Sequence, residues 1–294
     1  MKKSLAFIAP FLFIVCFVSG LWYLKHSRDN ILEKLVAEVK DTSVRFYCDE
    51  GEIAAKFATS TMALSLPDGR AFNLGEVRSG SGIRYSAGDI EFVGKGEGAF
   101  VTEKGNTIFN NCLAADITKR ADGMNVFRDR SGIFSFVFPG EVKISGGELG
   151  YTQTWRVDGA TSGQVLSIAT LPRDYIPEKT NFSEAKFVVG TSADPEALSS
   201  CLLASEGEEK IGLVEINGVS FSKFHFTGAG AGNFYDTMSY RTIKENQCYA
   251  AEYTVHSTNI GNYSPDQGVK EFNKEKVGQI MEGIVSTLSF SPAQ

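Results

Sequence analysis

Short runs of alternating apolar and polar residues fill the stretch 43–112, and turn residues separate one run from the next. Alternation with a period of two is typical of strands that bury one face. Between two runs stands Pro67-Asp68-Gly69-Arg70, where proline presets φ and glycine allows positive φ, so we expect a hairpin there. Some eight runs within about 75 residues predict a small, closed antiparallel β-barrel of eight strands, or a sandwich. The runs are VRFYC, EIAAKF, MALSL, AFNL, IRY, DIEFV, AFVT and TIFNNC.

The chain of 294 residues is long enough for two modest domains, each with its own core. Its 30 glycines against 8 prolines fit β-rich domains with many tight turns. The formal net charge of −6 argues against nucleic acid as a partner, because phosphates require a basic surface. An acidic surface fits a basic partner better.

The N-terminal 25 residues differ in character from all that follows. Met1-Lys2-Lys3 is followed by an uncharged, mostly apolar run at residues 5–24. A helix of that length, at 1.5 Å per residue, spans the roughly 30 Å hydrocarbon core of a membrane. We therefore predict a signal anchor, a single transmembrane helix, at residues 1–25, and the positive-inside rule places the rest outside the cytoplasm. Cleavage after Val18-Ser19-Gly20 is the alternative.

Residues 29–41 carry apolar side chains at helical spacing, which predicts a short stalk helix within residues 26–42. Together with the anchor, this organisation predicts a protein with a single membrane span and its domains outside the cytoplasm. Cleavage near Gly20 would instead release the protein on that side of the membrane.

Four cysteines follow the predicted anchor: Cys48, Cys112, Cys201 and Cys248. An even number of cysteines in an exported chain indicates disulfides. Their spacing divides into one bridge per domain, Cys48 with Cys112 and Cys201 with Cys248. Four reduced, buried thiols are the alternative. The sequence has no CxxC motif and no cluster of cysteine with histidine, so we expect neither a metal nor a cofactor.

Five motifs stand in order within residues 45–113. They are Tyr47-Cys48-Asp49, Leu66-Pro67-Asp68-Gly69-Arg70, Ser79-Gly80-Ser81-Gly82-Ile83-Arg84-Tyr85, Lys95-Gly96 and Asn111-Cys112. In this order and spacing, the segment resembles the family of membrane-bound lysozyme inhibitors of C-type lysozyme, the MliC/PliC group. The resemblance implies an eight-stranded barrel that plugs the cleft of a C-type lysozyme, which would be the protein partner.

The resemblance also implies which residues act. Ser81 and Lys95 are the two that would insert into the lysozyme cleft. A serine hydroxyl can hydrogen-bond to a carboxyl group and a lysine ammonium can pair with a carboxylate, and neither offers a bond to cleave. The alternative is that Ser81 is only a polar turn residue and Lys95 only a solvated charge. The supporting motif residues are Ser79, Gly80, Gly82, Arg84, Tyr85 and Gly96, of which Tyr85 is expected in the barrel core.

The strand before Lys95 departs from the family pattern at two positions. Val93 stands where we expect tryptophan, and Gly94 stands where we expect serine or threonine. Both inserting residues remain in place. Residues 43–118, the predicted barrel domain, hold seven basic and ten acidic residues, a net charge of −3. This charge suits a basic lysozyme modestly, mainly through the association rate.

The remainder, residues 123–294, predicts a separate α+β domain of unknown role. Its layout loosely resembles PsbP-like domains of bacterial envelope proteins. Two helices are expected, at 194–204, where Asp194-Pro195-Glu196 forms a good start, and at 270–285. The expected strands cover residues 133–138, 165–170, 211–216, 219–226, 234–241 and 249–255, followed by a final strand STLSF.

The function that the resemblance and the predicted anchor favour is a non-enzymatic inhibitor of C-type lysozyme, anchored by one span in the inner membrane of a bacterium with its domains in the periplasm, or released into the periplasm by cleavage near Gly20. One alternative is a non-inhibitory module that binds a glycan or an envelope protein, with residues 123–294 carrying the main role. A hydrolase built from Ser239, Asp236 and His256 is a weaker alternative, because no GxSxG elbow occurs. The glycine-rich stretch 228–232 lies between two strands rather than before a helix, so we expect a hairpin loop and not a nucleotide site.

Overall fold

The structure is a computed structural model that describes residues 42–147, 156, 162–176 and 178–291. The predicted signal anchor at residues 1–25 lies outside the described residues. So does the predicted stalk at 26–42, except that Thr42 already begins the first strand. Within the described ranges, no helix is both long enough and apolar enough to cross a membrane.

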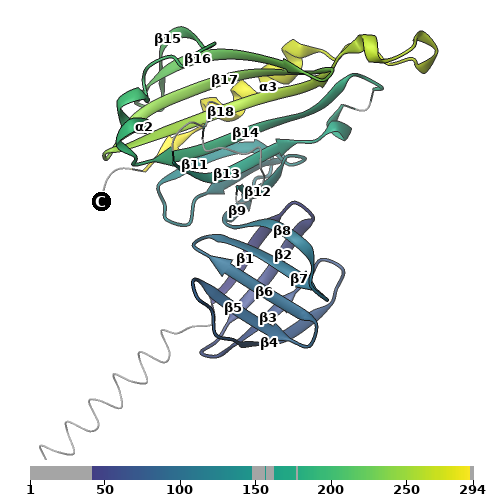
Figure 1. The fold of residues 1–294 in the computed structure, drawn as a ribbon, viewed down its shortest axis with the longest axis vertical. Coiled ribbons are helices and arrows are strands. Elements are labelled where there is room, and N and C mark those ends of the chain that lie inside the picture. Colours follow the sequence, from purple (N-terminus) through teal and green to yellow (C-terminus); the bar gives the residue numbers. More distant parts are fainter. Residues whose placement is uncertain (1–41, 148–155, 157–161, 177, 292–294) are drawn as a thin grey trace, which may run out of the picture.

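The first eight strands form a closed antiparallel barrel, as the alternating pattern predicts. Each strand pairs with the next along the chain, and the barrel closes where Phe46 and Tyr47 of the first strand lie opposite Ala114 and Leu113 of the last. Figure 1 shows the barrel as a body of its own beside the larger β-rich region. Its strands are β1 (Thr42–Cys48), β2 (Gly51–Phe57), β3 (Thr61–Ser65), β4 (Ala71–Glu76), β5 (Ile83–Ala87), β6 (Ile90–Lys95), β7 (Gly98–Glu103) and β8 (Asn106–Ala114).

Alternate residues of the barrel strands point inward and form a separate apolar core. Phe92 is completely buried at its centre, and its ring meets that of Phe46 edge to face with centroids 5.3 Å apart. The predicted disulfide between Cys48 and Cys112 is formed. Because it joins the first strand to the last, it fastens the barrel at the place where it closes.

The barrel ends at Ala114, earlier than the predicted boundary at residue 118. The next strand, β9 (Asp116–Lys119), pairs with β10 (Met124–Arg128) rather than with a barrel strand. The reason is that Ile117 packs against the core of the second region. With β11 (Phe134–Pro139) and β19 (Ser289–Phe290), these strands make a four-stranded sheet in the order β19-β11-β10-β9.

A seven-stranded antiparallel sheet makes up most of the second region (Figure 1). The second region contains more strand than the predicted α+β domain, because the strands at 143–147 and 182–192 were not expected from the sequence. The spatial order is β12-β13-β14-β18-β17-β16-β15. The strands are β12 (Lys143–Gly147), β13 (Gln164–Leu171), β14 (Phe182–Ser192), β15 (Glu209–Ile216), β16 (Val219–Gly230), β17 (Asn233–Lys244) and β18 (Gln247–Thr258).

Both expected helices are present but shorter than predicted. Helix α2 (Pro195–Ser200) begins behind Asp194, whose side chain accepts a hydrogen bond from the Glu196 amide at 2.9 Å. Helix α3 (Lys274–Ser286) begins only after the cap Asn273, so the residues from 270 to 273 are not helical. The short 3-10 helices are η1 (Arg173–Tyr175), η2 (Ile260–Asn262) and η3 (Pro265–Gln267).

The glycine-rich stretch 228–232 is a hairpin, as expected, but its loop is tighter than the sequence suggests. Strand β16 continues to Gly230, which lies opposite Asn233 at the start of β17. Only Ala231 and Gly232 form the turn, and both have positive φ, at 49° and 78°. Positive φ at both turn residues is the conformation that suits a two-residue hairpin.

Helix α3 packs on β11, β14 and β18, and its apolar face fills the core of the second region. A polar contact fixes its position on the sheet. The Glu282 carboxylate accepts hydrogen bonds from the hydroxyl of Tyr240 at 2.6 Å, the hydroxyl of Tyr253 at 3.1 Å and the ammonium of Lys223 at 3.0 Å. Burial and the Glu282 charge both raise the pKa of Tyr240 and Tyr253, which therefore stay protonated as donors.

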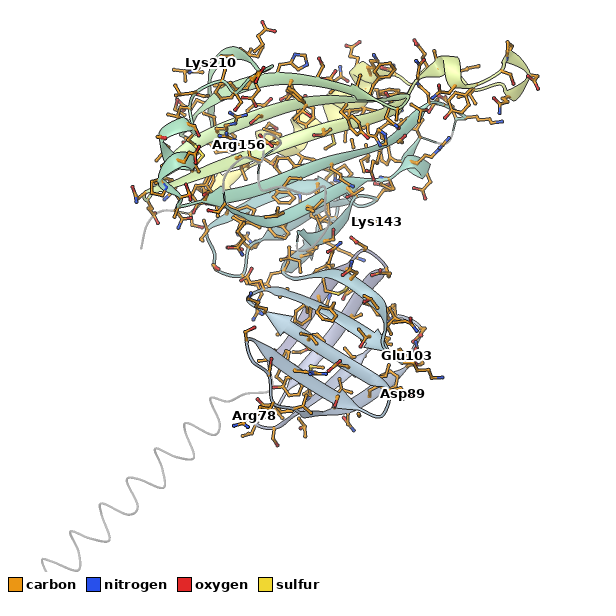
Figure 2. All side chains as sticks on the ribbon, in the orientation of Figure 1. Arg78, Asp89, Glu103, Lys143, Arg156 and Lys210 are labelled. Carbon is orange, nitrogen blue, oxygen red and sulfur yellow. A yellow bond between two sulfur atoms is a disulfide. The ribbon has the colours of Figure 1, made fainter. Side chains whose placement is uncertain are left out.

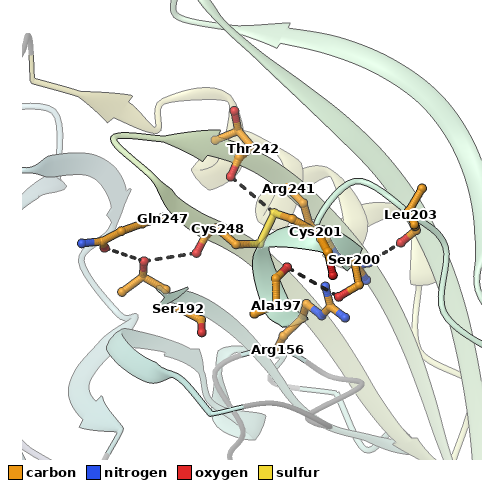
Figure 3. Close-up of a disulfide and its surroundings, with 12 residues drawn as sticks. Arg156, Ser192, Ala197, Ser200, Cys201, Leu203, Arg241, Thr242, Gln247 and Cys248 are labelled. Atoms are coloured by element: carbon orange, nitrogen blue, oxygen red, sulfur yellow. Dashed lines mark hydrogen bonds between the residues drawn. A yellow bond between two sulfur atoms is a disulfide. The ribbon is translucent and has the colours of Figure 1, made fainter. Parts of the chain in front are cut away.

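The opposite face of the large sheet carries the second predicted disulfide, Cys201 with Cys248, which is also formed (Figure 3). It attaches the end of α2 to β18. Beside it lies Arg241, fully buried, whose guanidinium pairs with Glu208 and Glu252. A buried cation is tolerated only where carboxylates and hydrogen bonds compensate for its lost hydration, as they do here.

The barrel and the second region are in direct contact. Strand β12 lies against β8 and β1, and a Cβ on Gly146 would come within 3.3 Å of the Asn111 carbonyl oxygen. The barrel residue Leu113 belongs to the core of the second region. Figure 2 shows Lys143 of β12 at this junction.

Two carboxyl groups meet across the same junction. Glu97, in the turn after β6, hydrogen-bonds to Asp129, which is buried in the turn after β10 and accepts from the Ile133 amide at 3.2 Å. Burial is the main cause that raises the pKa of both carboxyl groups, and the Asp129 charge raises that of Glu97 further. A proton is therefore held more tightly in the folded state than in the unfolded chain.

Asp129→Asn is expected to change how stability depends on pH. Because both pKa values are raised on folding, their contribution is full in acid, below the ordinary carboxyl pKa of about 4, and is lost as the pH rises through the folded values. The variant should therefore melt at a higher temperature than the wild type at pH 8, with a smaller or no advantage at pH 4. Asp89→Asn, an exposed carboxylate on the barrel (Figure 2), is the control and should show no such trend in thermal unfolding followed by circular dichroism.

Candidate functional site

The predicted site begins with the loop between β4 and β5. Its base is closed by a hydrogen bond from the Val77 amide to the Arg84 carbonyl at 2.9 Å. Within the loop, the Ser79 hydroxyl donates to the Ser81 carbonyl at 2.7 Å. This contact holds the loop backbone, while the Ser81 side chain itself is exposed. Ser79 therefore acts on the loop conformation, and Ser81 is the hydroxyl that the loop presents.

Gly82 brings this loop onto the end of β6. Its φ is +70°, and a Cβ there would lie only 2.2 Å from the Gly94 carbonyl oxygen. The next residue, Ile83, lies opposite Gly94 in the β5–β6 register. Since Lys95 directly follows Gly94, the structure brings Ser81 and Lys95 together at neighbouring strand ends. Only glycine permits so close an approach of one backbone to another.

The close pairing of β5 with β6 also explains why glycine stands at position 94. A Cβ on Gly94 would meet the Ile83 side chain at 3.0 Å and the Phe92 ring at 3.2 Å. The serine or threonine expected at this position would therefore crowd the β5–β6 pairing in this barrel. The departure from the family pattern is a local packing adjustment that leaves Lys95 at the end of its strand.

Lys95 ends β6 and is exposed. Gly96, with φ +60°, makes the turn that lets Lys95 lie opposite Gly98. Across the described part of the chain, no carboxylate lies within ion-pair distance of the Lys95 ammonium. Lys95 thus offers an uncompensated positive charge at the strand end on which the Ser81 loop packs.

The other two side chains of the motif have structural roles. The Arg84 guanidinium pairs with the Glu91 carboxylate on the adjacent strand, and this contact raises the Arg84 pKa. Tyr85 is only 6% exposed and packs against Phe57 in the barrel core, as predicted, and burial raises its pKa. Arg84 is therefore already neutralised, and Tyr85 supports the strand from inside.

The second region borders the site, which the sequence did not indicate. A small cavity of about 90 Å³ is lined by Lys95 and Glu97 on the barrel side and by Gln164 and Leu166 of β13 on the other. No local pattern signals this proximity, because it depends on how two separate sheets dock. A partner that contacts Lys95 therefore approaches beside β13.

Gly82→Ala tests the close approach of the β4–β5 loop to the end of β6. The methyl group would overlap the Gly94 carbonyl, and a positive φ costs an alanine further energy, of order 1–3 kcal/mol. We expect the melting temperature of the barrel to fall by about 10 °C. Gly80→Ala is the matched control, since a Cβ there meets nothing within 4 Å, and it should melt close to the wild type. Equal melting of both variants would contradict the geometry.

The residues of the hydrolase hypothesis are not assembled. The Ser239 hydroxyl donates to Glu252 at 2.5 Å and is buried, Asp236 pairs with His225, and His256 contacts Asn233 at 2.9 Å. Among the residues that the structure describes, no group of three or more histidine, cysteine, aspartate or glutamate side chains is arranged to hold a metal ion.

The family match among known proteins lies within the barrel. Residues 46–110 match the family model described as "Membrane-bound lysozyme-inhibitor of c-type lysozyme". A curated protein of Escherichia coli (strain K12), named "Membrane-bound lysozyme inhibitor of C-type lysozyme", is 27% identical over 113 residues, which cover 38% of this chain and 92% of that protein. A solved structure from Bacteroides thetaiotaomicron VPI-5482 aligns with 57% of this chain and 48% of its own, at 14% identity and a TM-score of 0.31, too low to support any inference.

Proposed function

We propose that this protein, whose residues 46–110 form a segment of the MliC family, inhibits a C-type lysozyme by inserting Ser81 and Lys95 into its active-site cleft. The observation that carries the proposal is the contact of Gly82 with the end of β6, which places the loop of the exposed Ser81 next to the strand end that carries Lys95. The function is binding and occlusion, without catalysis.

The chemistry of the target explains this pair of groups. Retaining glycosidases such as lysozyme work with one carboxylic acid and one carboxylate, about 5 Å apart. The Ser81 hydroxyl can hydrogen-bond to the first, and the Lys95 ammonium can form a charge-assisted hydrogen bond with the second. Neither group can be cleaved, so the cleft stays blocked.

The net charge of the barrel should raise the rate of association with lysozyme more than the affinity of the complex. Its seven basic and ten acidic residues give a net charge of −3 over residues 43–118, which attracts a basic lysozyme at long range. Close to the cleft the sign is reversed, because Lys95 faces the catalytic carboxylates. Added salt should therefore slow association while affecting dissociation less.

We further propose that the protein acts outside the cytoplasm. Two formed disulfides support an oxidising compartment. The apolar run at residues 5–24 supports attachment to the inner membrane, with release into the periplasm after cleavage near Gly20 as the alternative. The name of the E. coli relative describes that protein as membrane-bound.

The test is inhibition of cell-wall lysis by a C-type lysozyme, using the full-length protein in mild detergent. We expect the wild type to block lysis and Ser81→Ala to lose about ten-fold in potency, because leaving a buried carboxyl group without its hydrogen-bond partner costs roughly 1–3 kcal/mol. Ser65→Ala, an exposed serine on β3, is the matched control. Full potency of Ser81→Ala would overturn the insertion, and no inhibition by the wild type would overturn the function and favour a non-inhibitory binding module.

A further inference from the structure

A second cavity lies in the region outside the barrel, between the inner face of the large sheet and the first turns of α3. Its volume is about 560 Å³. Small-molecule sites are typically clefts of about 300–1,000 Å³ with apolar walls and a few polar groups. The cavity is formed by β16, β17, β18 and α3, and it shares no residue with the site around Lys95.

Apolar side chains form part of the walls that face α3. Met238 of β17 and Val255 of β18 form the sheet side, and Phe272, which precedes α3, is buried at one end. Phe234 also lines the cavity and is 45% exposed. Together these side chains offer contact for a flat apolar body.

Gly278 keeps the helix side of the cavity open. It stands in the interior of α3, where glycine costs about 1 kcal/mol relative to alanine. A Cβ at this position meets nothing within 4 Å. The helix thus lacks a side chain at a position that lines the cavity.

Two sets of polar groups line the cavity, the His225–Asp236 pair and Lys274. His225 and Asp236 engage each other, with 2.8 Å between the imidazole Nε2 and the carboxylate Oδ1. Lys274, the first residue of α3, has no carboxylate within ion-pair distance among the residues that the structure describes. A lysine at the positive end of a helix dipole is electrostatically unfavourable. An anion bound beside it would compensate the charge of the lysine and that of the helix end.

We propose that this cavity binds a small molecule with a flat apolar body and one anionic group. The body lies under Gly278 against Met238 and Val255, and the anion faces Lys274. This site is independent of lysozyme inhibition, since its residues lie outside the barrel.

The probe that fits this description is anilinonaphthalene sulfonate, an aromatic body with one sulfonate, whose fluorescence rises in apolar sites. We expect saturable, one-to-one binding to the full-length protein. Gly278→Leu, which fills the cavity from the helix, should weaken binding at least ten-fold. Gly283→Leu is the matched control, because it makes the same change on an exposed position of α3 where a Cβ also meets nothing within 4 Å. Lys274→Gln should weaken binding roughly five-fold.

Thermal unfolding distinguishes loss of the site from loss of the fold. Leucine favours a helix over glycine, so neither leucine variant should melt below the wild type. Equal probe binding by Gly278→Leu and the wild type, or an equal loss in Gly283→Leu, would overturn the site. Unchanged binding by Lys274→Gln would overturn the anionic assignment. Lysozyme inhibition by Gly278→Leu should equal that of the wild type, so each proposal can fail without the other.

Discussion

Replacing Lys95 with glutamate is expected to weaken binding to a C-type lysozyme by at least 100-fold. In the proposed complex the Lys95 ammonium lies against a catalytic carboxylate inside a cleft from which water is excluded. Removing one partner of such a desolvated, hydrogen-bonded pair costs about 2–5 kcal/mol, and a glutamate adds repulsion between two carboxylates. The measurement is the dissociation constant by surface plasmon resonance, where the loss should lie mainly in a faster dissociation rate.

Lys104→Glu is the matched control for this substitution. Lys104 is also an exposed lysine next to a turn glycine, but it lies at the opposite end of β6, where its amide donates to the Asp89 carbonyl at 2.9 Å. Both variants change the net charge by the same amount. An equal loss of affinity would therefore mean that only the overall charge of the barrel matters, and it would contradict insertion of Lys95.

Replacing Cys48 and Cys112 together with alanine is expected to destabilise the barrel by about 4 kcal/mol. The disulfide closes a loop with a sequence separation of 64, and the chain-entropy model assigns that amount to a loop of this size. The barrel depends on this bridge because the β1–β8 register is short, with the pairs Phe46–Ala114 and Tyr47–Leu113, extended by a hydrogen bond from the Asp49 amide to the Asn110 carbonyl at 3.1 Å. Hydrogen exchange measured by mass spectrometry should show peptides from β1 and β8 exchanging up to about 1,000-fold faster.

The paired replacement of Cys201 and Cys248 provides the comparison. Its loop, with a sequence separation of 47, has nearly the same entropic cost, but the bridge holds α2 to β18. Exchange should accelerate around α2 and remain unchanged in the barrel, and lysozyme inhibition should be retained. Faster exchange of β1 and β8 in this variant would contradict the separation of the two cores.

The barrel was largely predictable because short sequence patterns specify most of its strands and turns. A period of two, a Pro-Asp-Gly turn and a cysteine pair at its ends specify strands, hairpins and closure without any distant contact. The choice of Ser81 and Lys95 came instead from the family resemblance, and their insertion into lysozyme remains a proposal. The exposed hydroxyl, the buried Tyr85 and the formed disulfide agree with what the motifs indicate.

The second region was less predictable because its features depend on long-range packing. Strand β14 was missed because it is buried between β13 and β18, so its register is set by partners far away in the sequence. The start of α3 was placed too early because the cap at Asn273, and not the apolar pattern, sets it. The contact of Glu97 with Asp129 and the cavity beside Gly278 arise only when separate elements dock.

Occlusion of the lysozyme cleft is tested most directly by steady-state kinetics of a C-type lysozyme on a soluble oligosaccharide substrate, at several concentrations of the full-length protein. If Ser81 and Lys95 occupy the cleft, substrate and inhibitor exclude each other, so the apparent KM should rise in proportion to inhibitor concentration while kcat stays constant. A fall in kcat at constant KM would place the protein elsewhere on lysozyme and contradict the account.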